Sequence, residues 1–164
     1  MKNQITIIFI FLISISFAQS EIEIHLDYDP GVNYSGQTIT HYSSEAYFQI
    51  PMKVINNSNN TIEIYFRRVL LESDVNISDQ FCDQVSCYSC GSDSVWSSPI
   101  PNSIISTDSS TMKPQGNFNN YGFANIRYFV INSSDESLID SVDLNLVYSS
   151  VTGIDYSKAI QINE

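Results

Sequence analysis

Apolar and polar residues alternate with a period of two along much of the chain. This period is typical of β-strands, because successive side chains of a strand point to opposite faces of the sheet. No segment keeps an apolar stripe with the 3.6-residue period of a helix. The alternation therefore predicts strands over 21–26, 46–54, 62–67 and 142–146.

Two apolar runs depart from simple alternation. Residues 123–131 carry apolar side chains on both faces, which predicts a central strand covered on both sides. Pro51 lies inside the run over 46–54 and lacks an amide donor. That strand is therefore expected at the edge of its sheet, or bulged at the proline.

Segments rich in Asn, Ser, Asp and Gly separate these runs. Residues 29–31, Asp-Pro-Gly, predict a turn, because Pro presets its backbone angle and Gly accepts a positive φ. Residues 31–45 predict a polar loop with one short strand. The Asn-rich residues 56–60 predict a hairpin-like turn, and 132–136 predict a further turn.

The alternation is lost between Glu72 and Asn117. This segment contains all three cysteines and the only tryptophan. We expect it to be long and irregular, with short strands at 104–105 and 110–112.

Composition supports a fold built from strands. Ile, Val, Tyr, Phe and Thr fill the apolar and semi-apolar positions, and such side chains suit a pleated surface better than a helix. Short alternating strands separated by polar turns predict an all-β protein, an antiparallel sandwich. The length fits one domain with one core.

The first 18 residues have the pattern of a secretory signal peptide. Lys2 supplies the positive charge, 5–13 are almost wholly apolar, and Ser16 and Ala18 are small residues at the cleavage site. This stretch is too short to span a bilayer. We therefore expect a cleaved signal over 1–18, a domain over 19–150 and a tail or linker over 151–164.

The chain is acidic, with 18 Asp and Glu against 7 Lys and Arg and a formal net charge of −11. Removing the signal removes only Lys2 among the charged residues, which takes the net charge to −12. Such a charge disfavours nucleic acid and anionic membranes as partners and keeps an exported domain soluble. We expect no integral membrane segment after signal cleavage.

Cys82, Cys87 and Cys90 allow two interpretations. Zinc would need four ligands, and His25 and His41, expected to be surface side chains, are far away in the sequence. In an exported chain a disulfide is favoured. Cys82–Cys87 closes a short loop without the strain of Cys87–Cys90, so Cys90 is left as a buried thiol or a thiol for pairing with another chain.

Three groups of residues stand out when they are taken together. They are Tyr65-Phe66-Arg67-Arg68; Asp79-Gln80-Phe81-Cys82-Asp83 with Ser86-Cys87-Tyr88; and Pro114-Gln115-Gly116 with Gly122-Phe123-Ala124 and the strands that follow. In combination they resemble a family of secreted Ig-like β-sandwich domains of Bacteroidetes, over about 47–151. The resemblance implies an Ig-like sandwich and the same Cys82–Cys87 disulfide. Phe66 stands where the family usually has Trp, and Cys90 is an additional cysteine.

Domains of this family often precede a sorting signal of the type IX secretion system. Residues 151–162 resemble the linker that leads into such a signal. The resemblance implies a place outside the cell or on the outer cell surface, with the periplasm as the alternative.

No catalytic motif is present: the chain has no G-x-S-x-G, no H-E-x-x-H and no Gly-rich phosphate loop. We predict no cofactor and no enzyme activity. Asp27, Asp29, Glu21 and Glu23 carry oxygen ligands suited to calcium, but a solvated strand end is the favoured interpretation.

Three aromatic residues, Tyr88, Trp96 and Tyr121, lie in or beside segments expected to be irregular. There they would stack on sugars or anchor a protein partner, although capping the core is the more common role. Ser94 and Ser141 lie in Asp-Ser-Val sequences that resemble the O-glycosylation acceptor of Bacteroidetes. Asn33, Asn56, Asn59, Asn76 and Asn132 lie in sequons that matter only in a eukaryotic secretory pathway.

The sequence favours a non-enzymatic, exported Ig-like module that binds a protein or glycan at or outside the cell surface. In this single domain we expect the disulfide to restrain a long loop, which two packed sheets hold rigid. One alternative is a subunit or accessory domain of a larger surface assembly, joined through Cys90 or an edge strand. A secreted enzyme or a metal-binding protein is the least favoured alternative.

Overall fold

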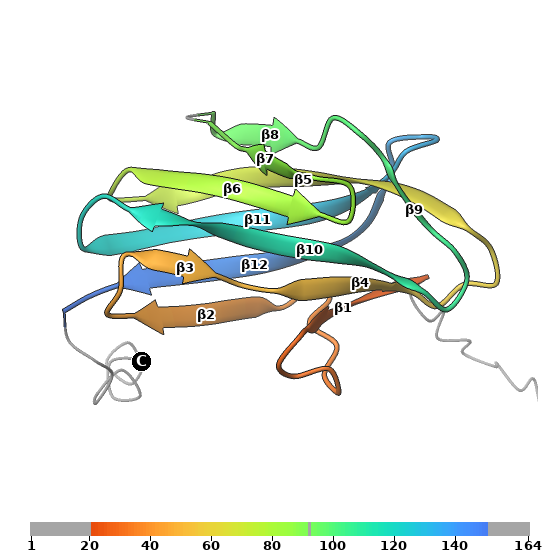
Figure 1. Cartoon of the computed structure of the whole chain (residues 1–164), viewed down its shortest axis with the longest axis horizontal. Helices are drawn as coiled ribbons and strands as arrows, with labels where there is room; N and C mark the ends of the chain where they lie inside the picture. Colours follow the sequence, from red (N-terminus) through yellow and green to blue (C-terminus); the bar gives the residue numbers. More distant parts are fainter. Residues whose placement is uncertain (1–20, 92, 151–164) are drawn as a thin grey trace, which may run out of the picture.

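The computed structural model describes residues 21–91 and 93–150 (Figure 1). These residues form twelve strands and no helix. The strands are β1 (Ile22–Leu26), β2 (Thr38–Ser43), β3 (Tyr47–Gln49), β4 (Met52–Asn56), β5 (Ile62–Ser73), β6 (Ile77–Asp83), β7 (Cys87–Ser89), β8 (Val95–Ser97), β9 (Asn102–Ile104), β10 (Ser109–Phe118), β11 (Gly122–Asn132) and β12 (Leu138–Tyr148).

The strands form two sheets packed face to face, seen in Figure 1 as a front and a back layer. Sheet 1 has the order β1-β4-β10-β6-β7, with β3 also paired to β10. Sheet 2 has the order β2-β12-β11-β5-β8, with β9 also paired to β5. All these pairs are antiparallel except β2 and β12, which are parallel. The predicted fold class, an all-β Ig-like sandwich, is confirmed.

The core lies between the two sheets, because each long strand turns every second side chain inward. Ile24, Val54 and Met112 of sheet 1 are fully buried, as are Phe66 and Leu146 of sheet 2. Burying apolar surface of this kind is the main term that stabilises a sandwich.

The strands predicted from simple alternation are confirmed as β1, β5 and β12. The short strand expected within 31–45 is β2. The central position predicted for 123–131 is also confirmed, since β11 lies between β12 and β5. The expectation that both faces of β11 are covered is wrong: Phe123, Arg127 and Phe129 on its outward face are only half-buried.

Pro51 interrupts a run that the alternation predicts as one strand. The chain forms β3 before it and β4 after it, and the inward residues Ile50 and Met52 stay buried across the break. The interruption fits the missing amide donor of proline. β4 itself is not an edge strand, because it lies between β1 and β10.

The hairpin-like turn predicted at 56–60 is wrong. These residues connect β4 of sheet 1 to β5 of sheet 2, so the two flanking strands are not paired. Asn56 is buried and holds this crossover, since its side-chain amide donates to the carbonyls of Asn60 at 2.7 Å and Ile104 at 2.9 Å.

The expectation of a long irregular segment over 72–117 is also wrong for most of its length. It contains β6 to β9 and nearly all of β10. The inward residues of β10 include Pro114 and Gly116, and its outward residues are polar, so the period-two signal there is weak. Pairing with β3, β4 and β6 forms the strand regardless.

The predicted signal peptide over 1–18 and the tail over 151–164 lie outside the described residues. Within the described part of the chain, no helix is long and apolar enough to cross a membrane.

Candidate functional site

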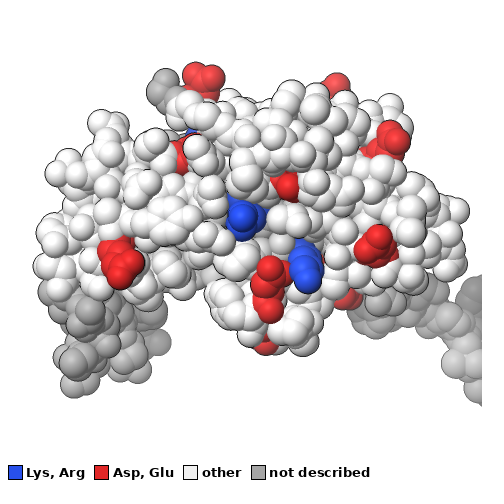
Figure 2. Space-filling view, viewed as in Figure 1, with Lys and Arg blue, Asp and Glu red and all other residues white. Residues whose placement is uncertain are grey.

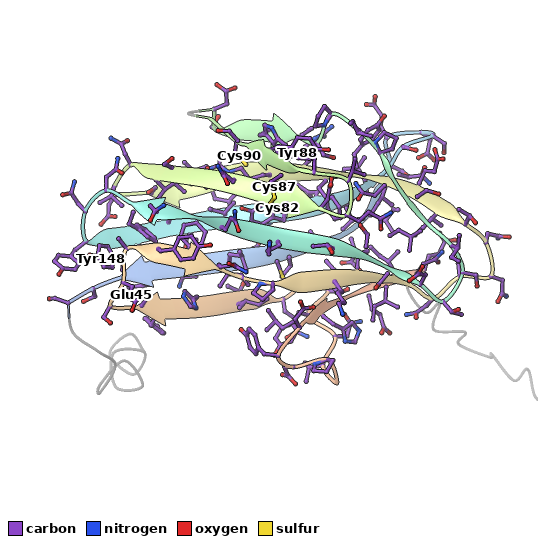
Figure 3. All side chains as sticks on the ribbon, viewed as in Figure 1. Glu45, Cys82, Cys87, Tyr88, Cys90 and Tyr148 are labelled. Carbon is purple, nitrogen blue, oxygen red and sulfur yellow. A yellow bond between two sulfur atoms is a disulfide. The ribbon has the colours of Figure 1, made fainter. Side chains whose placement is uncertain are left out.

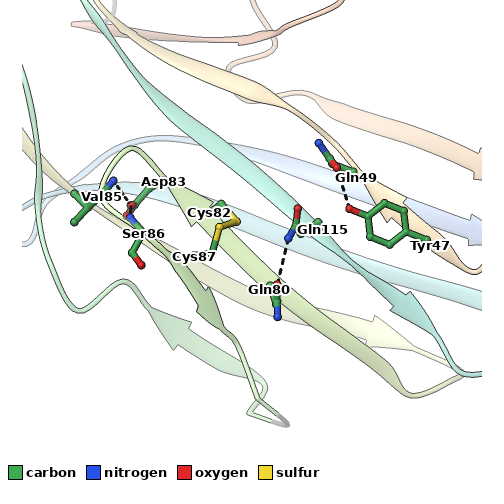
Figure 4. The surroundings of a disulfide bond; sticks show 9 residues. All are labelled: Tyr47, Gln49, Gln80, Cys82, Asp83, Val85, Ser86, Cys87 and Gln115. Atoms are coloured by element: carbon green, nitrogen blue, oxygen red, sulfur yellow. Dashed lines mark hydrogen bonds between the residues drawn. A yellow bond between two sulfur atoms is a disulfide. The ribbon is translucent and has the colours of Figure 1, made fainter.

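A disulfide joins the two strands of the β6–β7 hairpin (Figure 4). Cys82 and Cys87 are directly opposite each other in the strand register, with their Cα atoms 4.0 Å apart. Asp83 closes the turn, because its Oδ1 accepts the backbone N–H groups of Val85 at 2.8 Å and Ser86 at 2.9 Å. The disulfide therefore restrains a tight hairpin and not the long loop expected from the sequence.

Cys90 follows this hairpin and is a buried free thiol. Its backbone N–H donates to the carbonyl of Asp79 at 3.1 Å. Burial raises the pKa of the Cys90 thiol to about 12, and the nearby negative charge of Asp79 adds to this shift. The sequence left Cys90 either as a buried thiol or as a thiol for pairing with another chain. In the structure it is a buried thiol.

An ion pair between Arg68 and Asp79 links the two sheets beneath the hairpin. Arg68 is on β5 of sheet 2 and Asp79 is on β6 of sheet 1, and Nε of Arg68 donates to Oδ2 of Asp79 at 2.8 Å. Nη1 of Arg68 donates to the carbonyl of Asp93 at 2.7 Å. Both side chains are almost wholly buried, with 2% and 0% of their surface exposed.

Two polar atoms near this pair have no hydrogen-bond partner of good geometry among the described residues: Oδ1 of Asp79 and the hydroxyl of Tyr128. Burial raises the pKa of the Asp79 carboxyl, and the charge of Arg68 opposes this shift. Burial also raises the pKa of Tyr128 well above its ordinary value. The cluster is sealed inside the sandwich, and we interpret it as structural.

The three candidate binding-loop aromatics do not form one site. The rings of Tyr88 and Trp96 pack against each other at a tilt, with centroids 5.8 Å apart, and Trp96 packs against the core residue Phe81. Tyr121 is 58% exposed and packs on Tyr148 at 4.5 Å. Figure 3 shows Tyr88 beside the cysteines and Tyr148 at the far end of the sandwich. Tyr88 and Trp96 thus cap the core.

Ser94 and Ser141 differ in accessibility. Ser94 is exposed just before β8, and its carbonyl accepts the N–H of Leu70 at 2.7 Å. Ser141 is half-buried within β12. Their glycosylation stays a prediction.

Two of the candidate calcium ligands, Asp27 and Asp29, have other partners. Asp27 lies 3.8 Å from the ammonium of Lys53, and the hydroxyl of Tyr34 donates to Asp29 at 2.7 Å. No group of His, Cys, Asp and Glu suited to a metal ion is found among the described residues. Asp27 and Asp29 are therefore paired within the chain.

The expectation that His25 is a surface side chain is wrong. His25 is buried. Both ring nitrogens have partners: Nε2 lies 3.0 Å from the carboxylate of Glu23, and Nδ1 lies 2.9 Å from the carbonyl oxygen of Pro30. The turn after β1 folds over it. His41 on β2 is half-buried, and this burial lowers its pKa.

The outward face of sheet 1 carries a compact group of amide side chains, which we call the amide face. The strand register aligns three glutamines across β3, β10 and β6: Gln49, Gln115 and Gln80. The next row joins Tyr47 of β3 to Asn117 of β10. The amide face comprises Tyr47, Gln49, Gln80, Gln115 and Asn117.

Two hydrogen bonds order the amide face (Figure 4). The hydroxyl of Tyr47 donates to Oε1 of Gln49 at 2.9 Å, and Nε2 of Gln115 donates to Oε1 of Gln80 at 3.2 Å. The disulfide lies in the adjacent row, where Cys82 is opposite Lys113. The disulfide therefore holds the β6–β7 hairpin, which forms one side of the amide face.

The amide face is uncharged in a chain whose formal net charge is −11. Figure 2 shows this side of the molecule, where charged side chains are few and scattered over a largely uncharged surface. Amides both donate and accept hydrogen bonds, so the face can bind a neutral polar partner at either kind of group. Side chains of this type on a rigid sheet suit binding and offer no nucleophile.

Sequence reasoning missed both the amide face and the buried ion pair, although the motif residues contained the signal. Asp79 and Arg68, from two separate motifs, point inward and meet between the sheets. Gln80, next to Asp79, and Gln115, next to the buried Pro114, point outward. Period-two alternation inside each motif would have separated the two groups.

No family model matches the chain, and no curated protein matches it. Among solved structures, the N-terminal domain of PorA has a TM-score of 0.51 and 12% identity, covering 80% of this chain and 99% of its own. PapD-like domain 7 of human CEP192 has a TM-score of 0.43 and 8% identity, covering 92% and 100%. The CooA pilin subunit from enterotoxigenic Escherichia coli has a TM-score of 0.38 and 8% identity, covering 79% of this chain and 99% of its own. At such identities the likeness concerns the fold alone.

Proposed function

We propose that this protein is a non-enzymatic, exported binding module that contacts a neutral polar partner through the amide face. The observation that carries the proposal is the alignment of Gln49, Gln115 and Gln80 across three strands of a disulfide-stapled sheet. Such a row presents donors and acceptors at the roughly 4.8 Å spacing of neighbouring strands.

A partner of this chemistry is a glycan or an uncharged protein surface. Both offer hydroxyl or peptide groups that pair with amides, and neither is repelled by the acidic remainder of the chain. The rigid sheet reduces the entropy lost on binding, because the side chains are already held by hydrogen bonds to one another.

Photocrosslinking in the producing cells tests this function. A photoreactive amino acid in place of Gln115 is expected to capture a surface glycan or protein, identified by mass spectrometry. The matched control carries the same group at Thr40, which is exposed on β2 of the other sheet. Equal capture at both positions, or no capture at position 115, contradicts the proposal.

We further propose that the protein belongs to the secreted Ig-like domains of Bacteroidetes and acts outside the cell or on its outer surface. Its signal-like N-terminal pattern and its disulfide support export. The expected mature N-terminus is Gln19, which intact-mass analysis of protein from culture medium and from periplasm would check. Recovery from the periplasm alone favours the alternative location.

The burial of Cys90 weighs against covalent assembly through this thiol. The alternative of an accessory subunit then depends on non-covalent contact, through an edge strand or the amide face itself. Size-exclusion chromatography with light scattering on the purified chain separates a monomer from such an assembly.

A further inference from the structure

A hollow lies on the outward face of sheet 2, where β5, the segment after β8 and the β11–β12 turn meet. Its volume is about 310 Å³, and its lining includes Tyr65, Arg67, Ser97, Pro99, Ile131 and Glu136. We call it the Arg67 hollow. Its size lies at the lower end of the range for small-molecule sites.

Arg67 presents an oriented guanidinium to this hollow. On β5 it is opposite Ser97 of β8, and its Nε donates to the Ser97 hydroxyl at 3.2 Å. None of the ion pairs among the described residues involves Arg67. In contrast, Arg127 on the same sheet is held by both oxygens of Asp143. The terminal nitrogens of Arg67 are therefore donors available to a ligand.

Glu136 contributes a carboxylate from the β11–β12 turn. It is exposed, and no ion pair among the described residues involves it. Its φ is +57°, in the left-handed region where glycine or asparagine is the usual occupant. A glutamate here costs backbone strain, and strained positions are concentrated at functional sites.

Apart from the buried Ser98, the rest of the lining is apolar or aromatic. Tyr65 is half-buried on the same outward face of β5 as Arg67, and Ile131 is opposite it on β11. Pro99 adds a second apolar surface. The Arg67 hollow thus combines a planar donor, a planar acceptor, a hydroxyl and an aromatic ring.

We propose that the Arg67 hollow is a binding site for a neutral saccharide. Neighbouring hydroxyls of a sugar accept from Arg67 and donate to Glu136, while the apolar face of the sugar ring packs on Tyr65. An anionic sugar is disfavoured by Glu136 and by the acidic chain. A zwitterion would depend on two exposed ion pairs, each contributing at most about 1 kcal/mol.

The site is independent of the amide face, which lies on the other sheet. The test uses the purified full chain with a panel of neutral methyl hexosides and oligosaccharides, followed by NMR titration and calorimetry. We expect at least one neutral saccharide to bind and to shift the ring signals of Tyr65. The absence of binding across the panel, or preferred binding of glycine or diglycine, overturns the proposal.

Variants assign the binding to the hollow. Glu136→Gly removes the carboxylate and the backbone strain together, so we expect a higher melting temperature and binding weaker by roughly tenfold or more. This combination cannot result from misfolding. Tyr65→Ala should abolish binding, whereas Tyr65→Phe should retain most of it. Lys53→Gln, at an exposed position of β4 on the other sheet and outside the amide face, is the control and should bind as the parent does. Undiminished binding by Glu136→Gly overturns the proposal, and a matching loss in Lys53→Gln does so as well.

Discussion

Individual residues of the three sequence motifs have clear physical roles in the fold. Arg68 and Asp79 form the ion pair between the sheets, and Asp83 closes the disulfide hairpin. A Cβ atom at Gly116 would lie 2.6 Å from the carbonyl oxygen of Ser78, so only glycine allows β10 and β6 to approach this closely. These motif residues therefore support the scaffold.

Breaking the buried ion pair should be costly. Asp79→Leu or Arg68→Met alone leaves an unpaired buried charge and should lower the free energy of unfolding by about 3–5 kcal/mol. The double variant should recover much of this loss, because no charge is left buried. Urea denaturation of all four proteins gives the coupling energy. Additive losses in the double variant would contradict the pairing.

Cys90 should be chemically inert in the folded protein. Because its pKa is raised to about 12, the thiol stays protonated at pH 8, and burial also blocks access to reagents. We expect no alkylation by iodoacetamide in native buffer and one label per chain in guanidinium without reductant. Mass spectrometry counts the labels. Full labelling of the native protein would show that Cys90 is accessible.

At the scale of elements, the β6–β7 hairpin is the best-defined unit beside the amide face. It combines the disulfide, the Asp83 turn and the packing of the Tyr88 ring against Trp96 of β8. β7 has only three residues and lies at the edge of sheet 1. A strand this short depends on the covalent staple more than a central strand does.

Removing the disulfide should cost about 2 kcal/mol, because a loop this short restricts the unfolded chain only modestly. The double variant Cys82→Ala/Cys87→Ser is expected to fold with a lower urea midpoint. A phosphine reductant should lower the parent to a similar midpoint and leave the variant unchanged. An unchanged midpoint in the variant would show that the staple has no role in stability.

At the scale of the whole molecule, two features matter: the acidic surface and the arrangement of the strands in two sheets. Arg68 and Arg127, two of its few cations, are paired with carboxylates, while most acidic residues face solvent. The two proposed binding surfaces lie on opposite sheets. A sandwich of this kind has room for two ligands at once.

Salt should stabilise the protein. The surface repulsion expected at a net charge near −11 favours the expanded chain, and counter-ions screen it within a few ångströms at high ionic strength. We expect the melting temperature to rise between low salt and about 0.5 M sodium chloride. A falling melting temperature would instead indicate that attractive ion pairs dominate.

Sequence reasoning was reliable where structure is set by neighbouring residues. The inward faces of β1, β5 and β12 follow from alternation, and the Cys82–Cys87 pairing follows from spacing. It failed for 72–117 and for the turn at 56–60, where pairing with distant strands decides the conformation. It also treated His25 as a surface residue, although the turn containing Pro30 covers it.

The sequence alone determined that this chain is acidic and rich in strands and that a disulfide closes a short loop, because period, composition and cysteine spacing are local properties. Only the tertiary structure decided which strands share a sheet, and hence which polar residues meet. Gln49, Gln80 and Gln115 are far apart in the chain and adjacent on the sheet. Arg68 and Asp79 meet only because two sheets pack face to face. Strand pairing is non-local, so no window of the sequence contains it.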